Sequence, residues 1–328
     1  MAWLVTGGAG YIGSHVVRAF GEVGLDAVVV DDLSSGHRAF VRPEVPLVEG
    51  SIVDTSLLVE AIEKHEVEGV VHLAGYKYAG VSVQRPLHTY VQNVTGTINL
   101  LEAMARTGVD KIVFSSSAAT FGTPDVETVT EQTATNPESP YGESKLIGEW
   151  LIRDQAVATG LMHTSLRYFN VVGSGADDLY DTSPHNLFPI VFEMLLAQGT
   201  PRINGDDYET PDGTCVRDYV HVADLAAAHV VAAQQLSAGQ PLAPIYNLGS
   251  GTGSSVRAIM DAIRTVTGID FTPEVGPRRP GDPARIVATG EAAARDLDWK
   301  MRHSLEDMVR SAWQARSAAQ GADGMIGT

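Results

Sequence analysis

The chain of 328 residues has few basic residues, a single cysteine and no long apolar run. Its 23 Lys and Arg stand against 40 Asp and Glu, so its formal net charge is −17. This balance disfavours nucleic acid and anionic membrane surfaces as partners, because both attract basic patches. With Cys215 as the one cysteine, a disulfide framework and a cysteine-based zinc site are excluded. The ten histidines show no metal-ligand spacing, so we predict no metal site.

No apolar stretch is long enough to cross a membrane, and no basic and apolar leader precedes the first motif. We therefore expect a cytoplasmic protein without a membrane partner. Hydrophobic residues make up 44% of the chain, which excludes disorder throughout. The length fits two domains of ordinary size.

Short runs rich in Val and Ile alternate with helical patterns through the first half of the chain. The runs at 27–31 and 69–73 are apolar without alternation, as strands of a parallel sheet covered on both faces must be. The pattern predicts an α/β fold with a doubly wound parallel sheet of Rossmann type. We predict this domain at residues 1–173, with 222–248 returning to it, and a smaller mixed α/β substrate-binding domain at 174–328.

A glycine-rich turn follows the first predicted strand and opens the first predicted helix. In residues 6–13, the glycines Gly7, Gly10 and Gly13 have a G-x-x-G-x-x-G spacing. Glycine lets the backbone approach a pyrophosphate, and a helix N-terminus attracts phosphate groups. Asp31, at the end of the second strand, is suited to bind ribose hydroxyls and would repel a 2′-phosphate. Glycines alone indicate only a tight turn, but this strand–turn–helix setting favours a dinucleotide site, with NAD over NADP.

A Tyr-x-x-x-Lys pair begins a predicted helix after Pro140. Tyr141 and Lys145 share one helix face, because they are four residues apart. An ammonium beside the phenol, together with the positive ring of NAD⁺, predicts a lowered pKa for Tyr141 and a general base near neutral pH. Such pairs are common in unrelated helices. Here the pair follows a dinucleotide motif and Ser117 at a strand end, where these sheets bind ligands.

The glycine motif and the set Ser117, Tyr141 and Lys145 resemble the extended short-chain dehydrogenase/reductase superfamily. Further segments narrow the resemblance: His72-Leu-Ala-Gly-Tyr-Lys, Asn93-Val-Thr-Gly-Thr, Arg167-Tyr-Phe-Asn, Val216-Arg-Asp-Tyr-Val-His-Val, Tyr246-Asn-Leu-Gly and Arg278-Arg-Pro-Gly-Asp. In this order they are similar to the UDP-glucose (UDP-galactose) 4-epimerases over almost the whole chain, to about Trp313. The resemblance implies NAD as cofactor, a UDP-sugar as substrate and a homodimer formed through a helix pair.

The chemistry that the resemblance implies is a reversible oxidation at C4 of the sugar. Tyr141 removes the 4-hydroxyl proton, with Ser117 as a relay, while NAD accepts the hydride. The 4-keto sugar then turns about its link to UDP and is reduced on its other face. Dehydratases of this superfamily carry an Asp-Glu pair after the catalytic Ser or Thr, and this chain has Ala118 and Ala119 there. Elimination of water is therefore disfavoured.

The resemblance also implies the residues of both sites. Those of the NAD site are Gly7, Gly10, Tyr11, Ile12, Gly13, Asp31, Ser51, Ile52, Leu73, Ala74, Lys77, Asn93, Tyr141, Lys145 and Phe169. Those of the UDP-sugar site are Ser117, Tyr141, Asn170, Asn186, Leu187, Arg202, Asn204, Arg217, Arg279, Asp282 and Ile286. Arg217 and Arg279 would hold the diphosphate, because guanidinium forks suit phosphate oxygens, and Asp282 the uridine ribose. Taken singly, each arginine could equally form a surface ion pair, and Phe169 could pack in the core.

Two of these site residues depart from the family pattern. Ser51 replaces an aspartate that meets adenine, and Asn204 replaces an aromatic residue that stacks on uracil. Ile286 is shorter than the tyrosine that limits access in some relatives, which suggests activity on UDP-GlcNAc. Arg202 and Arg285 keep a UDP-uronic acid open as substrate, and a UDP-pentose is a further alternative.

A non-catalytic sensor of NAD or of sugar nucleotides could use the same fold. Such a sensor needs none of the residues Ser117, Tyr141 and Lys145, and all three are present. The sequence therefore favours an NAD-dependent isomerase, with UDP-glucose and UDP-galactose as the first-choice substrates.

Overall fold

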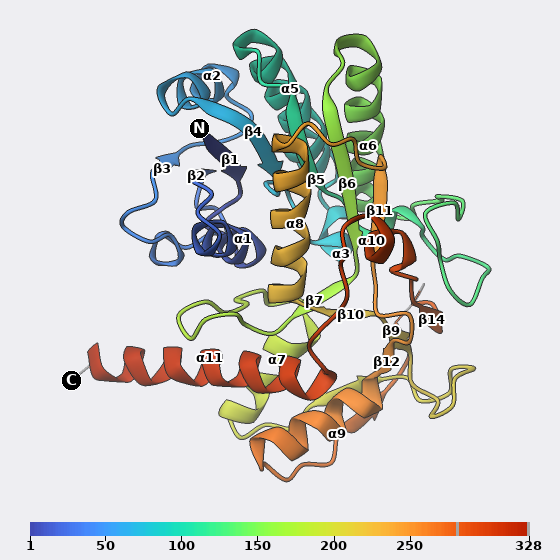
Figure 1. Cartoon of the computed structure of the whole chain (residues 1–328). Helices are drawn as coiled ribbons and strands as arrows, with labels where there is room; N and C mark the ends of the chain where they lie inside the picture. The colour runs from blue at the N-terminus through green and yellow to red at the C-terminus, as the bar shows by residue number, and fades with distance from the viewer. Residues whose placement is uncertain (280–281, 327–328) are drawn as a thin grey trace.

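A seven-stranded parallel sheet forms the centre of the protein (Figure 1). This computed structural model describes residues 1–279 and 282–326, and the strand order of the sheet is β11-β6-β5-β4-β1-β2-β3. Every neighbouring pair in it is parallel. The strands are β1 (Ala2–Thr6), β2 (Ala27–Asp31), β3 (Leu47–Glu49), β4 (Val67–His72), β5 (Lys111–Ser115), β6 (Met162–Tyr168) and β11 (Ile245–Leu248). The predicted doubly wound parallel fold is confirmed.

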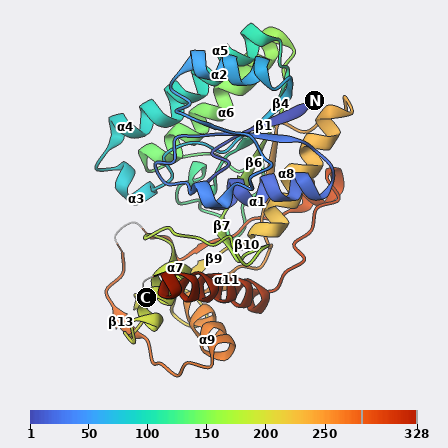
Figure 2. The same cartoon turned by 90° about the vertical axis from the view of Figure 1, so that its left-hand side faces the viewer.

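Helices cover both faces of this sheet (Figure 2). One face carries α1 (Tyr11–Glu22) and α8 (Val222–Ser237), and the other carries α2 (Thr55–Lys64), α5 (Gly96–Thr107) and α6 (Pro140–Thr159). Each layer has its own buried core: Val5 of β1 belongs to the first, and its neighbour Leu4 to the second. Because successive strand residues point to opposite layers, the strands are apolar without alternation.

The start of α6 is fixed by local sequence. Ser139 Oγ accepts a hydrogen bond from the N–H of Gly142, and Pro140 occupies the first turn. These two signals begin the helix at the carboxyl edge of the sheet. Tyr141 and Lys145 therefore lie in its first two turns.

Most segments after β6, but not α8, β11 and α10 (Glu291–Asp296), form a smaller, mixed part beyond the carboxyl edge of the sheet (Figure 1). There α7 (Leu187–Leu196), α9 (Val256–Thr267) and α11 (Leu305–Ile326) share a core. Short strands pair as β7–β10, β8–β13 and β12-β9-β14. Their bounds are β7 (Asn170–Val172), β8 (Arg202–Asn204), β9 (Val216–Arg217), β10 (Tyr219–His221), β12 (Ser254–Ser255), β13 (Glu274–Gly276) and β14 (Arg285–Ile286). Helix α8 and strand β11 lie between these segments in the sequence, but α8 packs on α1 and β11 pairs with β6 of the main sheet. A domain boundary at residue 173 stays a prediction.

Shorter elements complete the fold. They are α3 (Ala79–Ser82), α4 (Pro86–Tyr90), a π-helical turn (Val91–Thr95), α10 (Glu291–Asp296), and 3-10 turns at Arg38–Phe40 and Ala118–Thr120. Within the described ranges 1–279 and 282–326, no helix is both long and apolar enough to cross a membrane. The same ranges contain no group of three or more potential metal ligands. Pro280 and Gly281, in the last of the sequence motifs, lie outside the described residues.

Candidate active site

A cavity of about 1170 Å³ lies between the carboxyl edge of the sheet and the smaller part. The predicted residues that line it are Gly7, Gly10, Tyr11, Ile12, Gly13, Asp31, Ile52, Leu73, Ala74, Lys77, Tyr141, Lys145, Phe169, Asn170, Asn186, Leu187, Arg202, Asn204, Arg217, Arg279 and Asp282. Ser51, Asn93, Ser117 and Ile286 are predicted residues that do not line it. The predicted cofactor and substrate residues thus share one continuous space.

The cavity is more basic than the chain as a whole. Seven basic and five acidic side chains line it, although the net charge of the protein is −17. The basic residues are Lys77, Arg85, Lys145, Arg202, Arg217, Arg279 and Arg316. A concave site with a local excess of positive charge suits an anionic ligand such as a nucleotide.

The glycine turn of residues 6–13 forms one end of the cavity. Gly7 has a φ of +74°, and a Cβ there would lie 2.7 Å from the backbone nitrogen of Ala74. A Cβ on Gly13 would lie 2.1 Å from the carbonyl oxygen of Gly7. Because neither position admits a side chain, the turn stays tight and its backbone stays open to a ligand. Helix α1 follows Gly10, which provides no side-chain cap, so its first N–H groups can bind a phosphate.

Asp31 ends β2 and lines the cavity beside this turn. Its carboxylate accepts hydrogen bonds of 2.9 Å from the N–H groups of Ala9 and Leu33. Burial raises the pKa of Asp31, while these hydrogen bonds and the charge of Lys77 act in the opposite direction. The backbone contacts fix the position of the carboxylate that is predicted to bind the ribose hydroxyls.

Two predicted cofactor residues lie behind the cavity wall. Asn93 accepts a hydrogen bond of 2.6 Å from the N–H of Tyr76 and donates to Ser144 Oγ at 2.8 Å. Ser51 Oγ accepts from the N–H of Val53 at 3.3 Å. The geometry therefore makes Asn93 a support of the loop after β4, because its amide is already bound within the chain.

The three predicted catalytic side chains lie close together. Lys145 is buried, and its Nζ donates a hydrogen bond of 2.9 Å to the carbonyl oxygen of Ser115 and lies 6.0 Å from the centre of the Tyr141 ring. Ser117 follows β5, and its hydroxyl accepts from the N–H of Ala119 at 3.1 Å. This hydroxyl also lies near the Tyr141 phenol and opposes the rise that burial causes in its pKa.

The pKa of Tyr141 is raised in the chain by itself, whereas the predicted lowering also depends on the positive ring of bound NAD⁺. Burial raises the pKa of this phenol, and the hydroxyl of Ser117 only opposes that rise. The ammonium of Lys145 binds the carbonyl of Ser115 instead of the phenol. Burial also lowers the pKa of Lys145 to about 8, against the opposing effect of Glu149. A lowered pKa at Tyr141 therefore requires a positive charge supplied by a ligand.

Predicted substrate residues reach the cavity from several segments of the smaller part. Arg217 in β9 forms an ion pair with Asp282, so each side chain fixes the other. Asn186, directly before α7, donates a hydrogen bond of 2.6 Å to Asp181. Asn170 in β7 donates at 3.1 Å to a main-chain carbonyl between β9 and β10. These contacts hold the side chains in place before any ligand arrives.

Two residues expected to affect sugar selection lie elsewhere. Ile286 is paired with Arg217 in the register of β14 with β9, and it does not line the cavity. Arg285 donates hydrogen bonds to the main-chain carbonyls of Glu127 at 3.3 Å and Thr252 at 3.1 Å. The geometry gives no support to a gating role for Ile286 or to a carboxylate-binding role for Arg285.

A group of four aromatic rings lines the cavity, and the sequence analysis did not predict that they would lie together. The ring centres of Tyr78 and His185 are 4.8 Å apart, those of Tyr76 and Tyr78 5.4 Å, and those of Tyr76 and His88 5.0 Å. The group joins the loop after β4 to the loop before α7. The signal in the sequence is a pair of tyrosines, Tyr76 and Tyr78, in the loop after β4, and two residues in a loop form no periodic pattern.

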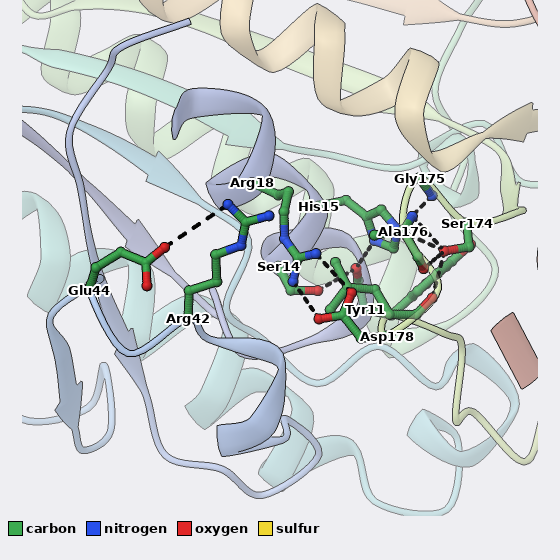
Figure 3. A network of polar contacts seen from close by, with 11 residues as sticks. Tyr11, Ser14, His15, Arg18, Arg42, Glu44, Ser174, Gly175, Ala176 and Asp178 are labelled. Atoms are coloured by element: carbon green, nitrogen blue, oxygen red, sulfur yellow. Dashed lines mark hydrogen bonds and ion pairs between the residues drawn. The ribbon is translucent and has the colours of Figure 1, made fainter. Parts of the chain in front are cut away.

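A polar network ties α1 to the loop that follows β7 (Figure 3). Tyr11 donates its hydroxyl to a main-chain carbonyl at the start of that loop at 2.6 Å. His15 Nε2 accepts from the N–H of Gly175 at 3.0 Å, and Arg18 forms two hydrogen bonds of 2.8 Å with Asp178. The helix at the glycine turn therefore also positions the loop that leads to α7.

Four buried histidines predict sensitivity to acid. Burial lowers the pKa of His72 to about 3 and those of His15, His221 and His229 to about 4, from an ordinary value of 6.5. Between about pH 6.5 and 4 the unfolded chain binds up to about four more protons than the folded one, so stability falls as the pH drops through this window. Denaturant unfolding at stepped pH should show this fall, and His229→Asn should reduce the proton uptake by about one. A stability independent of pH in that window would contradict the prediction.

A Rossmann-type sheet with a glycine turn, Asp31 and a Tyr/Lys pair around one cavity defines a dinucleotide-binding protein of the short-chain dehydrogenase/reductase type. The sequence profile described as "NAD dependent epimerase/dehydratase family" matches residues 3–249. The chain belongs to this NAD-dependent epimerase/dehydratase family. Its predicted cofactor, NAD, is thereby confirmed.

Relatives match nearly the whole chain. The UDP-glucose 4-epimerase of Azospirillum brasilense is 42% identical over 99% of this chain and 94% of its own length. A structure of UDP-glucose 4-epimerase from Brucella ovis in complex with NAD is 41% identical with a TM-score of 0.91, covering 95% of this chain and 97% of that one. The structure from Bifidobacterium longum in complex with NAD⁺ and UDP is 35% identical with a TM-score of 0.89, covering 97% and 98%. The predicted resemblance is confirmed.

Proposed function

We propose that this chain is an NAD-dependent 4-epimerase that interconverts UDP-glucose and UDP-galactose. The observation that carries the proposal is a single cavity that joins Tyr141 and Lys145 to a basic end around Arg217 and Arg279. Relatives named as UDP-glucose 4-epimerases over almost their full length support the same activity.

The residues at the glycine-turn end fit NAD. Gly7 and Gly13 leave no room for side chains, so a pyrophosphate can approach the backbone and the start of α1. Asp31 presents a fixed carboxylate to a ribose. When bound there, NAD supplies the acceptor and donor of hydride at C4 of the sugar.

The proton at the sugar 4-hydroxyl is handled by Tyr141. Its phenol is protonated in the chain alone because burial raises its pKa, and a positive charge nearby would stabilise the phenolate. The Ser117 hydroxyl lies near the phenol and acts to lower its pKa, so Ser117 is placed to relay the proton in both directions. Ala118 and Ala119 follow Ser117, and their methyl side chains have no acidic proton to donate. The site therefore lacks an acid for elimination at this position.

Epimerisation requires the 4-keto sugar to present both faces while its UDP part stays bound. Arg217, held by Asp282, and Arg279 are placed to bind the diphosphate. Asn186, directly before α7, lines the same space and is held by its hydrogen bond to Asp181. A cavity of about 1170 Å³ leaves the sugar room to turn about its link to the diphosphate.

A product assay tests the proposal. Purified protein is incubated separately with UDP-glucose, UDP-GlcNAc and UDP-glucuronic acid, and the C4 epimer of each is measured by chromatography. We expect UDP-galactose from UDP-glucose. Conversion of one of the other sugars alone would transfer the proposal to that substrate, and conversion of none would favour a non-catalytic sensor.

Fewer residues of the cavity support the alternative substrates. The expectation for UDP-GlcNAc depended on Ile286, and that for a UDP-uronic acid depended in part on Arg285; neither residue lines the cavity. Arg202 does line it and is the remaining cation for a carboxylate. No contact among the described residues separates a UDP-hexose from a UDP-pentose.

We also propose a homodimer that acts in the cytoplasm. Large apolar side chains are exposed on α4, on α6 and on the turn and helix between them: Leu87, Val91, Ile98, Trp150 and Val157. A second copy of the chain would cover such a surface. Light scattering on the purified protein distinguishes a dimer from a monomer.

A further inference from the structure

Asn204 contacts an arginine of the predicted diphosphate site. With its amide oxygen turned toward Arg279, it accepts two hydrogen bonds of 3.2 Å, from Nε and Nη2. The reverse orientation would set the amide NH₂ against donors only. Both side chains line the cavity. The polar contact of Asn204 is therefore with the side chain that faces the ligand space.

The backbone explains why the two segments meet. Gly205 has a φ of +82°, and a Cβ there would lie 2.6 Å from Cγ of Arg278 and 2.8 Å from the ring of Tyr208. The N–H of Gly205 also donates to the carbonyl of Gly276 at 2.8 Å. Because residue 205 has no side chain, the segment after β13 crosses closely over the end of β8.

The two neighbouring arginines of this segment have different partners. Arg278 forms an ion pair with Asp207 and lies 4.3 Å from the ring centre of Tyr208, outside the cavity lining. Arg279 forms no salt bridge with a carboxylate among residues 1–279 and 282–326. Its guanidinium has five N–H groups, and Asn204 takes two of them. Three N–H groups of the oriented fork remain for an anion.

We infer that Asn204 is a positioning residue that orients Arg279 toward the diphosphate of the bound nucleotide. Asn204 therefore strengthens the binding of the phosphates and not the binding of the base. The inference rests on the proposed function, since it presupposes a UDP-sugar in this cavity. Its neutral oxygen fixes the guanidinium without cancelling the charge, whereas Arg217 already shares its charge with Asp282. A base contact by Asn204 is the competing role, because the family pattern places a base-stacking residue here.

Calorimetric titration of the NAD-loaded protein with UDP and with uridine separates the two roles. Asn204→Leu keeps the size of the side chain and removes the acceptor. We expect it to weaken UDP binding about tenfold and to change uridine binding by less than about twofold. The KM for UDP-galactose should rise about as much as the Kd for UDP, with kcat nearly unchanged.

Three further variants complete the test. Like Asn204→Leu, Arg279→Ala should weaken the binding of UDP and leave the binding of uridine nearly unchanged. The double variant should bind UDP little more weakly than Arg279→Ala alone, because the two residues act as one unit. Arg278→Ala is the matched control, and it should bind UDP like the wild type because its side chain lies outside the cavity.

The outcomes separate the inference from the proposed function. Equal losses of UDP and uridine in Asn204→Leu, or additive losses in the double variant, overturn the positioning role. If the wild type fails to bind UDP, the proposed function falls and this inference falls with it.

Discussion

Replacing Tyr141 by Phe is expected to lower kcat for UDP-galactose by about 10²–10⁴-fold, the range typical of a lost general acid–base group. The variant keeps the ring that lines the cavity and removes only the phenol hydroxyl. Binding of UDP should stay near the wild-type value, because the diphosphate end around Arg217 is untouched. Turnover followed by chromatography and UDP binding followed by calorimetry measure the two effects separately.

Tyr168→Phe is the matched control for this variant. Tyr168 is a second phenol on the cavity wall, and burial raises its pKa as well. It has no lysine four residues later in the chain. We expect this variant to keep activity within about tenfold of the wild type. Normal turnover in Tyr141→Phe, or an equally large loss in Tyr168→Phe, would remove Tyr141 as the base.

Glu149→Ala is expected to lower the free energy of unfolding by about 3–5 kcal/mol, because it leaves a buried charge without its partner. Arg167 donates hydrogen bonds of 2.8 Å and 2.6 Å to the two carboxylate oxygens of Glu149, and the side chains are only 3% and 5% exposed. Ser116 also donates to this carboxylate. Denaturant unfolding monitored by circular dichroism measures the loss.

Glu102→Ala provides the comparison at the surface. Glu102 and Arg106 form an ion pair on α5 whose side chains are 53% and 61% exposed. Water and salt screen such a pair, so its removal should change the free energy of unfolding by about 0–1 kcal/mol. The prediction for the buried pair is wrong if both variants lose the same amount.

The buried pair also bears on the site. Glu149 is one helical turn after Lys145, and its charge raises the pKa of that lysine against the larger effect of burial. Glu149→Ala should therefore reduce the charged fraction of Lys145 near neutral pH as well as stability. The less disruptive Glu149→Gln keeps the shape of the side chain and tests the electrostatic effect with less loss of packing.

The local parts of the site could be predicted because they depend on neighbours in sequence. Gly7 and Gly13 lie within one strand–turn–helix segment. The path of this segment brings its backbone so close together that a Cβ on Gly13 would lie 2.1 Å from the carbonyl oxygen of Gly7. Tyr141 and Lys145 share a helix face by spacing alone. The strands were predictable because a sheet covered on both faces requires apolar residues throughout.

The contacts between distant segments could not be predicted in the same way. The pKa of Tyr141 depends on burial and on which group Lys145 binds, and the structure turns that lysine to the carbonyl of Ser115. Asn93 matches a family motif, yet its amide is bound within the chain. Ile286 lies outside the cavity, although comparison with the tyrosine of some relatives suggested that it limits access to the sugar site.

By itself, the sequence determined the Rossmann-type sheet, the glycine turn and the Tyr/Lys pair, since short-range spacing fixes backbone paths and helix faces. Only the tertiary structure decided which charged side chains face the cavity. Arg278 and Arg279 are adjacent, yet one binds Asp207 and the other meets Asn204, from a strand more than 70 residues earlier. That choice depends on how β8 and the segment after β13 cross at Gly205, and no spacing along the chain encodes such a crossing.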